Sequence, residues 1–167
     1  MSGSNALSLA KILSHKEVFT PRQATLCFLH DTANDPIDQA IIIYFKGPHS
    51  FTAEDVVEFQ CHGGVVVAQI ILETLVAHGV RLANPGEFSK RAFLNGRIDL
   101  SKAEAVIDVI NSQNEFALKS SVSQLKGSLS NMIKKVREDI IFEIAFIESA
   151  LDDPEHISLD GYNEKLT

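Results

Sequence analysis

Side chains that could bind a ligand concentrate in three short segments. In the first, Glu58 stands between apolar residues of the strand-like stretch 56–61. Side chains of a strand alternate between its two faces, so Glu58 shares a face with Val56 and Gln60. An ionised carboxylate only accepts hydrogen bonds and could bind the N–H groups of a heterocycle. The same alternation is typical of a half-exposed strand, so spacing alone favours the alternative of a solvent-facing Glu58.

Cys61 and His62 form the second segment, as candidates for a metal site or a Cys–His nucleophile. Neighbours in a strand point to opposite faces, and no second Cys/His pair lies nearby, so the sequence favours neither chemistry. Gly63 and Gly64 favour a tight turn from strand to helix, although a helix N-terminus there could still hold an anion. We predict no catalytic residue and no metal ligand in this chain.

Lys90, Arg91 and Arg97 make the third segment, a small positive island in an acidic chain. Arg97 follows Gly96 at an expected helix end, where a cation suits the helix dipole. Arginine geometry fits a carboxylate or a phosphate, so this segment could clamp an anion. The alternative is a solvated helix terminus.

Helical and strand-like periods alternate over the first hundred residues, and turn formers separate them. This part holds four of the five prolines and seven of the nine glycines. The pattern predicts a mixed α/β part with strands over 23–30, 38–45 and 56–61, the first two joined as a hairpin, and helices over 6–13, 65–78 and 87–94.

From Ser101 onward the pattern is helical throughout. Ser101 and Glu104 have the spacing of a capping box, which predicts a helix start. A heptad stripe then predicts one long helix packed in a bundle, with a free-standing coiled coil as the alternative. The stripe needs a partner surface in either case. Its members are Leu118, Val122, Leu125, Leu129, Met132 and Val136, followed after one slip by Ile140, Ile144, Ile147 and Leu151.

The charge is uneven and excludes several classes of protein. The chain has 167 residues, with 15 Lys and Arg against 22 Asp and Glu and a net charge of −7. Such an acidic chain is a poor nucleic-acid binder on its own. Two cysteines, and no apolar run of about 18 residues, indicate a cytoplasmic protein without a membrane segment. No P-loop is present, so we expect no GTP hydrolysis from this chain alone.

Two long motifs resemble the tRNA-modification GTPase family MnmE, also called TrmE. Residues 47–64, GPHSFTAEDVVEFQCHGG, are similar to that family's GPxS[YF]TGEDVxE…HGG signature, and residues 84–105 are similar to its PGEF…RAFLN…DL…AEA segment. The resemblance implies an α+β fold. Residues 1–100 would form a tetrahydrofolate-binding and dimerisation domain, a mixed β-sheet with packed helices like the folate-binding domain of the glycine-cleavage T-protein. Residues 101–167 would begin the central helical domain as a long α-helical segment.

The resemblance also implies a cofactor, 5-formyltetrahydrofolate or 5,10-methylenetetrahydrofolate. The family's folate-binding Glu falls on Glu58, and its basic residue falls on Arg97, where Lys is commoner. The family's N-terminal strand with its Arg, and a contact near the family's C-terminus, have no counterpart here. We therefore expect folate binding to be weakened or lost in this chain. The family's G domain, which would bind GTP, Mg²⁺ and K⁺, also has no counterpart in this sequence.

The family implies a function and partners for the whole protein. Its members form homodimers and work with the flavoprotein MnmG (GidA) on C5 of the wobble uridine of tRNA. The alternative is a non-enzymatic dimerisation or interaction module that uses the heptad stripe. A one-carbon transferase acting alone is disfavoured, because no activated acid–base pair is visible.

Overall fold

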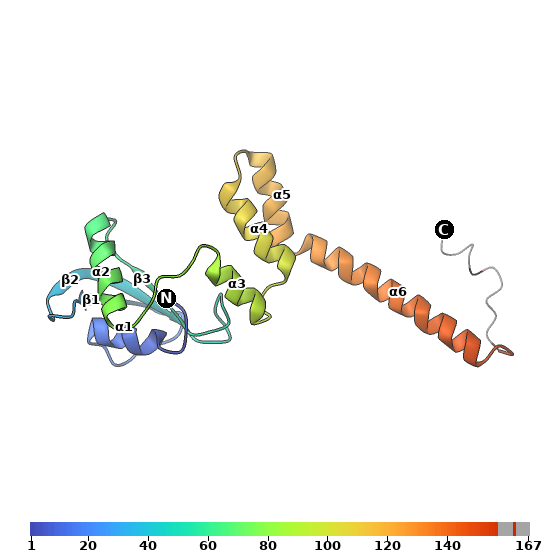
Figure 1. The fold of residues 1–167 in the computed structure, drawn as a ribbon, viewed down its shortest axis with the longest axis horizontal. Helices are drawn as coiled ribbons and strands as arrows, with labels where there is room; N and C mark the ends of the chain where they lie inside the picture. The colour runs from blue at the N-terminus through green and yellow to red at the C-terminus, as the bar shows by residue number, and fades with distance from the viewer. Residues whose placement is uncertain (157–161, 163–167) are drawn as a thin grey trace. The chain divides into compact units, whose positions relative to one another are not determined.

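The computed structural model describes residues 1–156 and Tyr162. The chain forms two compact units, residues 1–107 and residues 108–167 (Figure 1). The first unit combines a three-stranded sheet with helices, and the second is helical in its described residues. The expected α+β class is confirmed.

The sheet consists of β1 (Ala24–His30), β2 (Pro36–Phe45) and β3 (Val56–Gln60), in that spatial order. Both pairs are antiparallel, which confirms the hairpin of the first two strands. The sheet was expected to be mixed, and this detail is wrong for the described strands. The reason is that short connections link consecutive strands, and a parallel pair needs a crossover of a dozen residues or more.

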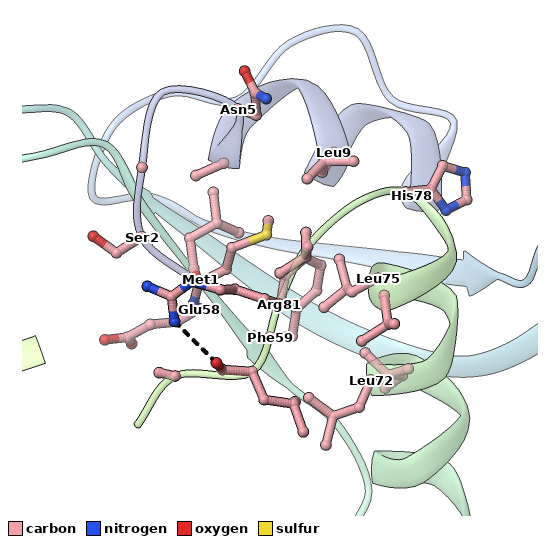
Figure 2. A pocket seen from close by; sticks show the side chains of 18 of the residues that line it. Met1, Ser2, Asn5, Leu9, Glu58, Phe59, Leu72, Leu75, His78 and Arg81 are labelled. Carbon is pink, nitrogen blue, oxygen red and sulfur yellow. Dashed lines mark hydrogen bonds between the residues drawn. The ribbon is translucent and has the colours of Figure 1, made fainter. Parts of the chain in front are cut away.

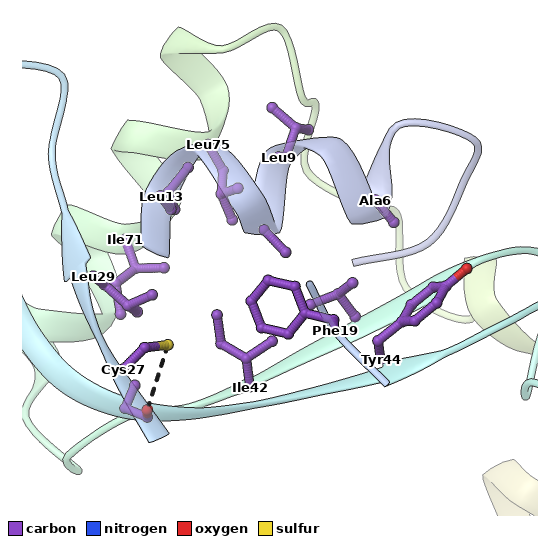
Figure 3. Close-up of a cluster of buried hydrophobic side chains, with 13 residues drawn as sticks. Ala6, Leu9, Leu13, Phe19, Cys27, Leu29, Ile42, Tyr44, Ile71 and Leu75 are labelled. Atoms are coloured by element: carbon purple, nitrogen blue, oxygen red, sulfur yellow. Dashed lines mark hydrogen bonds between the residues drawn. The ribbon is translucent and has the colours of Figure 1, made fainter. Parts of the chain in front are cut away.

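One face of the sheet is buried under α1 (Ala6–Ser14) and α2 (Val65–Ala77), as Figure 3 shows. Leu29, Ile42 and Val57 are fully buried there, because alternate strand residues point to this face. The next residues along the strands point to the other face. There Leu26 and Phe28 remain 57% and 53% exposed, so this second face, here called the outer sheet face, stays open among the described residues.

Two further helices follow, α3 (Glu87–Leu94) and α4 (Leu100–Asn111). The capping box predicted that Ser101 caps the helix, and this is wrong, because α4 already begins at Leu100. Asp99 is the residue that caps α4, since its Oδ1 accepts from the backbone N–H of Lys102 at 2.9 Å and from Ser101 Oγ at 2.7 Å. An Asp at this position satisfies a helix N–H just as a Ser would.

The predicted long helical segment is three helices rather than one. After α4 come α5 (Glu115–Leu125) and α6 (Ser128–Asp152). Asn114 begins α5 by accepting from Ala117 N at 2.8 Å, and Gly127 precedes α6 with a φ of 93°. A left-handed residue cannot continue an α-helix, so the heptad stripe is interrupted between α5 and α6.

Candidate ligand pocket

A cavity of about 790 Å³ lies in the first unit, beside β3 (Figure 2). Figure 2 shows Glu58 and Phe59 on β3, Leu72 and Leu75 on α2, and Leu9 on α1 around it. The remaining lining comes from residues 1–6, from the connection 78–83 and from the first turns of α3.

The start of the chain forms the rim of this pocket by pairing with β3. Ser2 makes an antiparallel bridge with Val56, and Val57 N donates to Met1 O at 3.0 Å. Gly3 N donates to Asp55 O at 2.9 Å. These bonds direct the alternating side chains of β3, so that Val57 is buried and Glu58 is exposed at the pocket.

The wall formed by α2 is apolar because this helix has hydrophobic residues on all sides. Leu75 is buried in the core, whereas Leu72 and Val76 are each 47% exposed and line the pocket. Glu58 is exposed where it lines the pocket, and its carboxylate interacts electrostatically with the α-amino group of Met1 but forms no hydrogen bond or ion pair among the described residues. The site thus combines an available acceptor with an apolar wall, which is typical of small-molecule sites.

A chain of charged groups fixes the opposite rim. Arg91 Nη1 lies 3.0 Å from Glu54 Oε2, and its Nη2 lies 2.9 Å from Glu87 Oε1. Arg81 Nη1 donates to Glu87 Oε2 at 2.8 Å, and the backbone N–H of Asn84 donates to the same oxygen at 2.9 Å. Arg81 above all, with the Asn84 amide and Arg91, holds the pKa of Glu87 well below its usual range.

The two motif segments of the sequence pack on each other. Asn95 Nδ2 donates to Thr52 O at 2.7 Å, and Arg97 Nε donates to Ser50 O at 3.2 Å. The loop 46–55 is itself tight, because a Cβ at Gly47 would lie 3.0 Å from Ala53 O. Residues of both motifs therefore serve to hold this loop against residues 91–97.

The structure separates the two site residues predicted from the sequence. Glu58 lines the pocket, whereas Arg97 does not. Arg97 is exposed and is held only through Nε, since its terminal nitrogens form no hydrogen bond within residues 1–156 and Tyr162. Sequence reasoning missed Arg81 altogether and did not foresee the pairing of Arg91. The i,i+4 spacing of Glu87 and Arg91 was the available signal for that pairing.

His62 has a structural partner. Its backbone N–H donates to Asp38 Oδ2 at 2.8 Å, and its Nδ1 lies 2.7 Å from Asp38 Oδ1. These contacts, first of all the backbone N–H, lower the pKa of Asp38. In the described part of the chain, no cluster of three or more His, Cys, Asp or Glu residues could hold a metal ion. No helix among the same residues is both long enough and apolar enough to cross a membrane.

Comparison with known proteins gives matches along nearly the whole chain. Residues 1–97 match the family model described as the GTP-binding protein TrmE N-terminus, and residues 100–166 match the MnmE helical domain. The curated relatives are named tRNA modification GTPase MnmE. That of Sulfurimonas denitrificans is 55% identical over 91% of this chain, that of Lachnoclostridium phytofermentans 57% over 78%, and that of a Sulfurovum species 46% over 99%.

These matches cover 34%, 28% and 39% of the three relatives, respectively, so the chain spans about a third of their length. The sheet and the helices α1 to α3 fall in the part matched by the TrmE N-terminus, and the helices α4 to α6 fall in the part matched by the helical domain. The chain therefore belongs to the tRNA modification GTPase family MnmE, also called TrmE.

Proposed function

We propose that this chain is the folate-binding and dimerisation region of a tRNA modification GTPase that acts on C5 of the wobble uridine. The observation that carries the proposal is the pocket beside β3, which Glu58 and apolar side chains of α2 line together and in which the Glu58 carboxylate forms no hydrogen bond with the described residues. Family membership supplies the context, since the region matched by residues 1–97 is the N-terminus of TrmE.

The chemistry of the pocket suits a reduced folate. The pteridine of 5-formyltetrahydrofolate or 5,10-methylenetetrahydrofolate is a heterocycle with N–H donors, which Glu58 would accept. Leu72 and Val76 would cover the ring. The volume of about 790 Å³ lies within the roughly 300–1,000 Å³ common for small-molecule sites.

Arg97 would bind the anionic end of the cofactor. Because Arg97 lies outside the pocket lining, a ligand that meets both residues must extend beyond the pocket. A folate has such a reach, since its glutamate tail continues from the ring through a benzoyl group. The guanidinium is anchored by Nε on Ser50 O, which leaves its fork for a carboxylate.

Titration with 5-formyltetrahydrofolate, up to millimolar concentration, tests the proposal. We expect at most weak binding by the chain, because the family's N-terminal strand and its Arg have no counterpart here, and at least about tenfold weaker binding still by Glu58→Ala, because hydrogen bonds to a charged group contribute about 1.5–3 kcal/mol. Glu17→Ala removes an exposed carboxylate outside the pocket and should leave affinity unchanged. Equal affinity of all three proteins would remove Glu58 from the site, and no binding by any of them at millimolar concentration would refute folate binding by this chain.

The rest of the activity would belong to the whole protein. The relatives are about three times as long as this chain. We propose that GTP hydrolysis with Mg²⁺ and K⁺ takes place in the part not matched here, and that the protein acts on tRNA with MnmG (GidA) in the cytoplasm. The homodimer would form through the outer sheet face, where the exposed Leu26 and Phe28 lie beside the half-buried Ile41 and Ile43.

A further inference from the structure

Two arginines that are distant in the sequence bind neighbouring carbonyls of the loop 46–55. Arg22 Nη2 donates to His49 O at 3.2 Å. Arg97 Nε donates to the next carbonyl, that of Ser50, also at 3.2 Å. Consecutive Cα atoms are about 3.8 Å apart, so both guanidinium groups lie at the same end of the loop. Both arginines are exposed.

A turn brings a third cation to this end of the loop. His49 N donates to Lys46 O at 3.0 Å, which closes a four-residue turn. The first and last Cα atoms of such a turn lie within about 7 Å of each other, so Lys46 is close to the residue that holds Arg22. The Lys46 side chain is exposed and forms no hydrogen bond or ion pair among the described residues. Arg22, Lys46 and Arg97 are here called the loop cations.

The loop cations keep donors available for an anion. Each arginine uses one nitrogen on the loop, and the other two nitrogens of each guanidinium form no hydrogen bond within the part of the chain that the structure describes. Residues 41–53 contain no Asp or Glu. Of the two carboxylates that follow, Glu54 is paired with Arg91 at 3.0 Å. Asp55 Oδ1 accepts from the backbone N–H of Gly47 at 2.9 Å. The loop therefore does not neutralise these cations, and an arginine fork suits a carboxylate.

The loop leads from the pocket to these cations. Arg91, which lines the pocket, is bound to Glu54 at the far end of the loop. Ser50 precedes Glu54 by four residues, so the two lie within about 14 Å of each other. Arg97 is bound at Ser50, and the other two loop cations lie beyond it along the loop. A ligand that leaves the pocket past Arg91 can therefore reach Arg97 first and the other two cations next.

We propose that the loop cations bind the γ-glutamyl chain of a polyglutamylated folate, which makes that form the preferred cofactor. This inference rests on the proposed function, in which the pteridine occupies the pocket and Arg97 meets the first glutamate. Each further γ-linked glutamate adds one carboxylate, and Arg22 and Lys46 supply one cation for each of two. In a chain with a net charge of −7, three cations suit a short polycarboxylate better than a nucleic acid, which needs a broad basic surface.

NMR titration of the full chain at low ionic strength tests the inference, with 5-formyltetrahydrofolate that carries either one or three glutamates. The triglutamate form should bind about fivefold more tightly, as expected for two further exposed ion pairs. Lys46→Gln, which breaks no hydrogen bond or ion pair of the described residues, should reduce this preference to about twofold. Lys46→Gln combined with Arg22→Gln should abolish it. Lys11→Gln is the matched control, because Lys11 lies on α1 and forms no hydrogen bond or ion pair with the described loop, and it should keep the full preference.

Two readouts separate this inference from the proposed function. Glu58→Ala should weaken both folate forms by the same factor, so the ratio of the two affinities reports on the loop cations and their absolute values report on the pocket. The γ-linked triglutamate peptide contains no pteridine. It should shift the side-chain N–H signals of Arg22 and Arg97 even where the pocket binds no folate.

Three results would overturn the inference. The first is equal affinity of the unaltered chain for the two folate forms. The second is the absence of any shift of the arginine signals with the triglutamate peptide. The third is a stronger shift with a uridine tetranucleotide than with the peptide, since the loop cations would then recognise phosphate rather than carboxylate.

Discussion

Replacing Thr52 by Val tests whether a hydrogen-bond relay fastens the start of the chain to the loop 46–55. The Thr52 side chain is fully buried, and its hydroxyl lies 2.7 Å from Ser2 Oγ. Ser2 donates its one proton to Glu54 Oε2 at 2.9 Å, so Thr52 must be the donor to Ser2. The relay therefore runs from Thr52 through Ser2 to the carboxylate that also binds Arg91.

The magnitude follows from the surroundings of this bond. Valine keeps the shape of threonine but removes the donor to Ser2 Oγ, together with the oxygen that accepts from Glu54 N at 3.4 Å. A net hydrogen bond contributes about 1 kcal/mol, and a buried partner left unsatisfied costs about 1–3 kcal/mol. Ser2 is only half-buried and can turn to water, so we expect the lower end, a loss of about 1–1.5 kcal/mol in the free energy of unfolding.

Urea unfolding of the full chain, followed through the NMR amide signals of β2, measures this loss within the first unit. The same substitution in a Ser2→Ala background should cost about 1 kcal/mol less, because the partner is already gone. An equal loss in both backgrounds would refute the relay, since the Thr52 hydroxyl would then act through its bond from Glu54 N and not through Ser2.

Two further predictions concern pH and assembly. The lowered pKa of Asp38 means that its contribution to stability is complete above the ordinary aspartate pKa of about 3.9 and is lost as the pH falls through the lower folded-state value. As the pH falls below about 4, the melting temperature of Asp38→Asn should therefore decrease less than that of the wild type. An equal decrease of melting temperature with pH in both proteins would contradict the Asp38–His62 interaction. Phe28→Lys on the outer sheet face should weaken the proposed dimer by roughly tenfold in light scattering, as expected for a well-packed interface residue. Val18→Lys, at a 78% exposed site off the sheet, should leave dimerisation unchanged. If Phe28→Lys dimerises as well as Val18→Lys, the outer sheet face is excluded as the dimer interface.

The sequence predicted most elements because their local signals agreed with their packing. The hairpin strands alternate between buried and exposed residues, and a turn rich in Asp and Asn joins them. The prediction of a single long helix was wrong because a hydrophobic period can continue across a break between two helices. Asn114 is a typical residue to begin a helix and Gly127 a typical residue to end one, but the apolar stripe was given more weight than either.

Site prediction met a different limit. Strand alternation is a local property, so the sequence could place Glu58 on the face opposite to Val57, but only the family resemblance indicated a ligand there. The environment of Arg97 could not be predicted, because its partner, the carbonyl of Ser50, is 47 residues away in the sequence. Arg81 resembled an ordinary surface cation, and only the fold brings it to Glu87 and to the pocket rim.

The packing of loop 46–55 against residues 91–97 has a consequence for synthesis of the protein. The contacts from Ser2 to Thr52, from Arg91 to Glu54 and from Arg97 to Ser50 span 50, 37 and 47 residues. A nascent chain that has exposed only its three strands can form the first of these contacts but lacks Arg91 and Arg97. The pocket rim can therefore be completed only after Arg91 has left the ribosome, and until then the apolar side chains of the pocket wall are open to other nascent or unfolded chains.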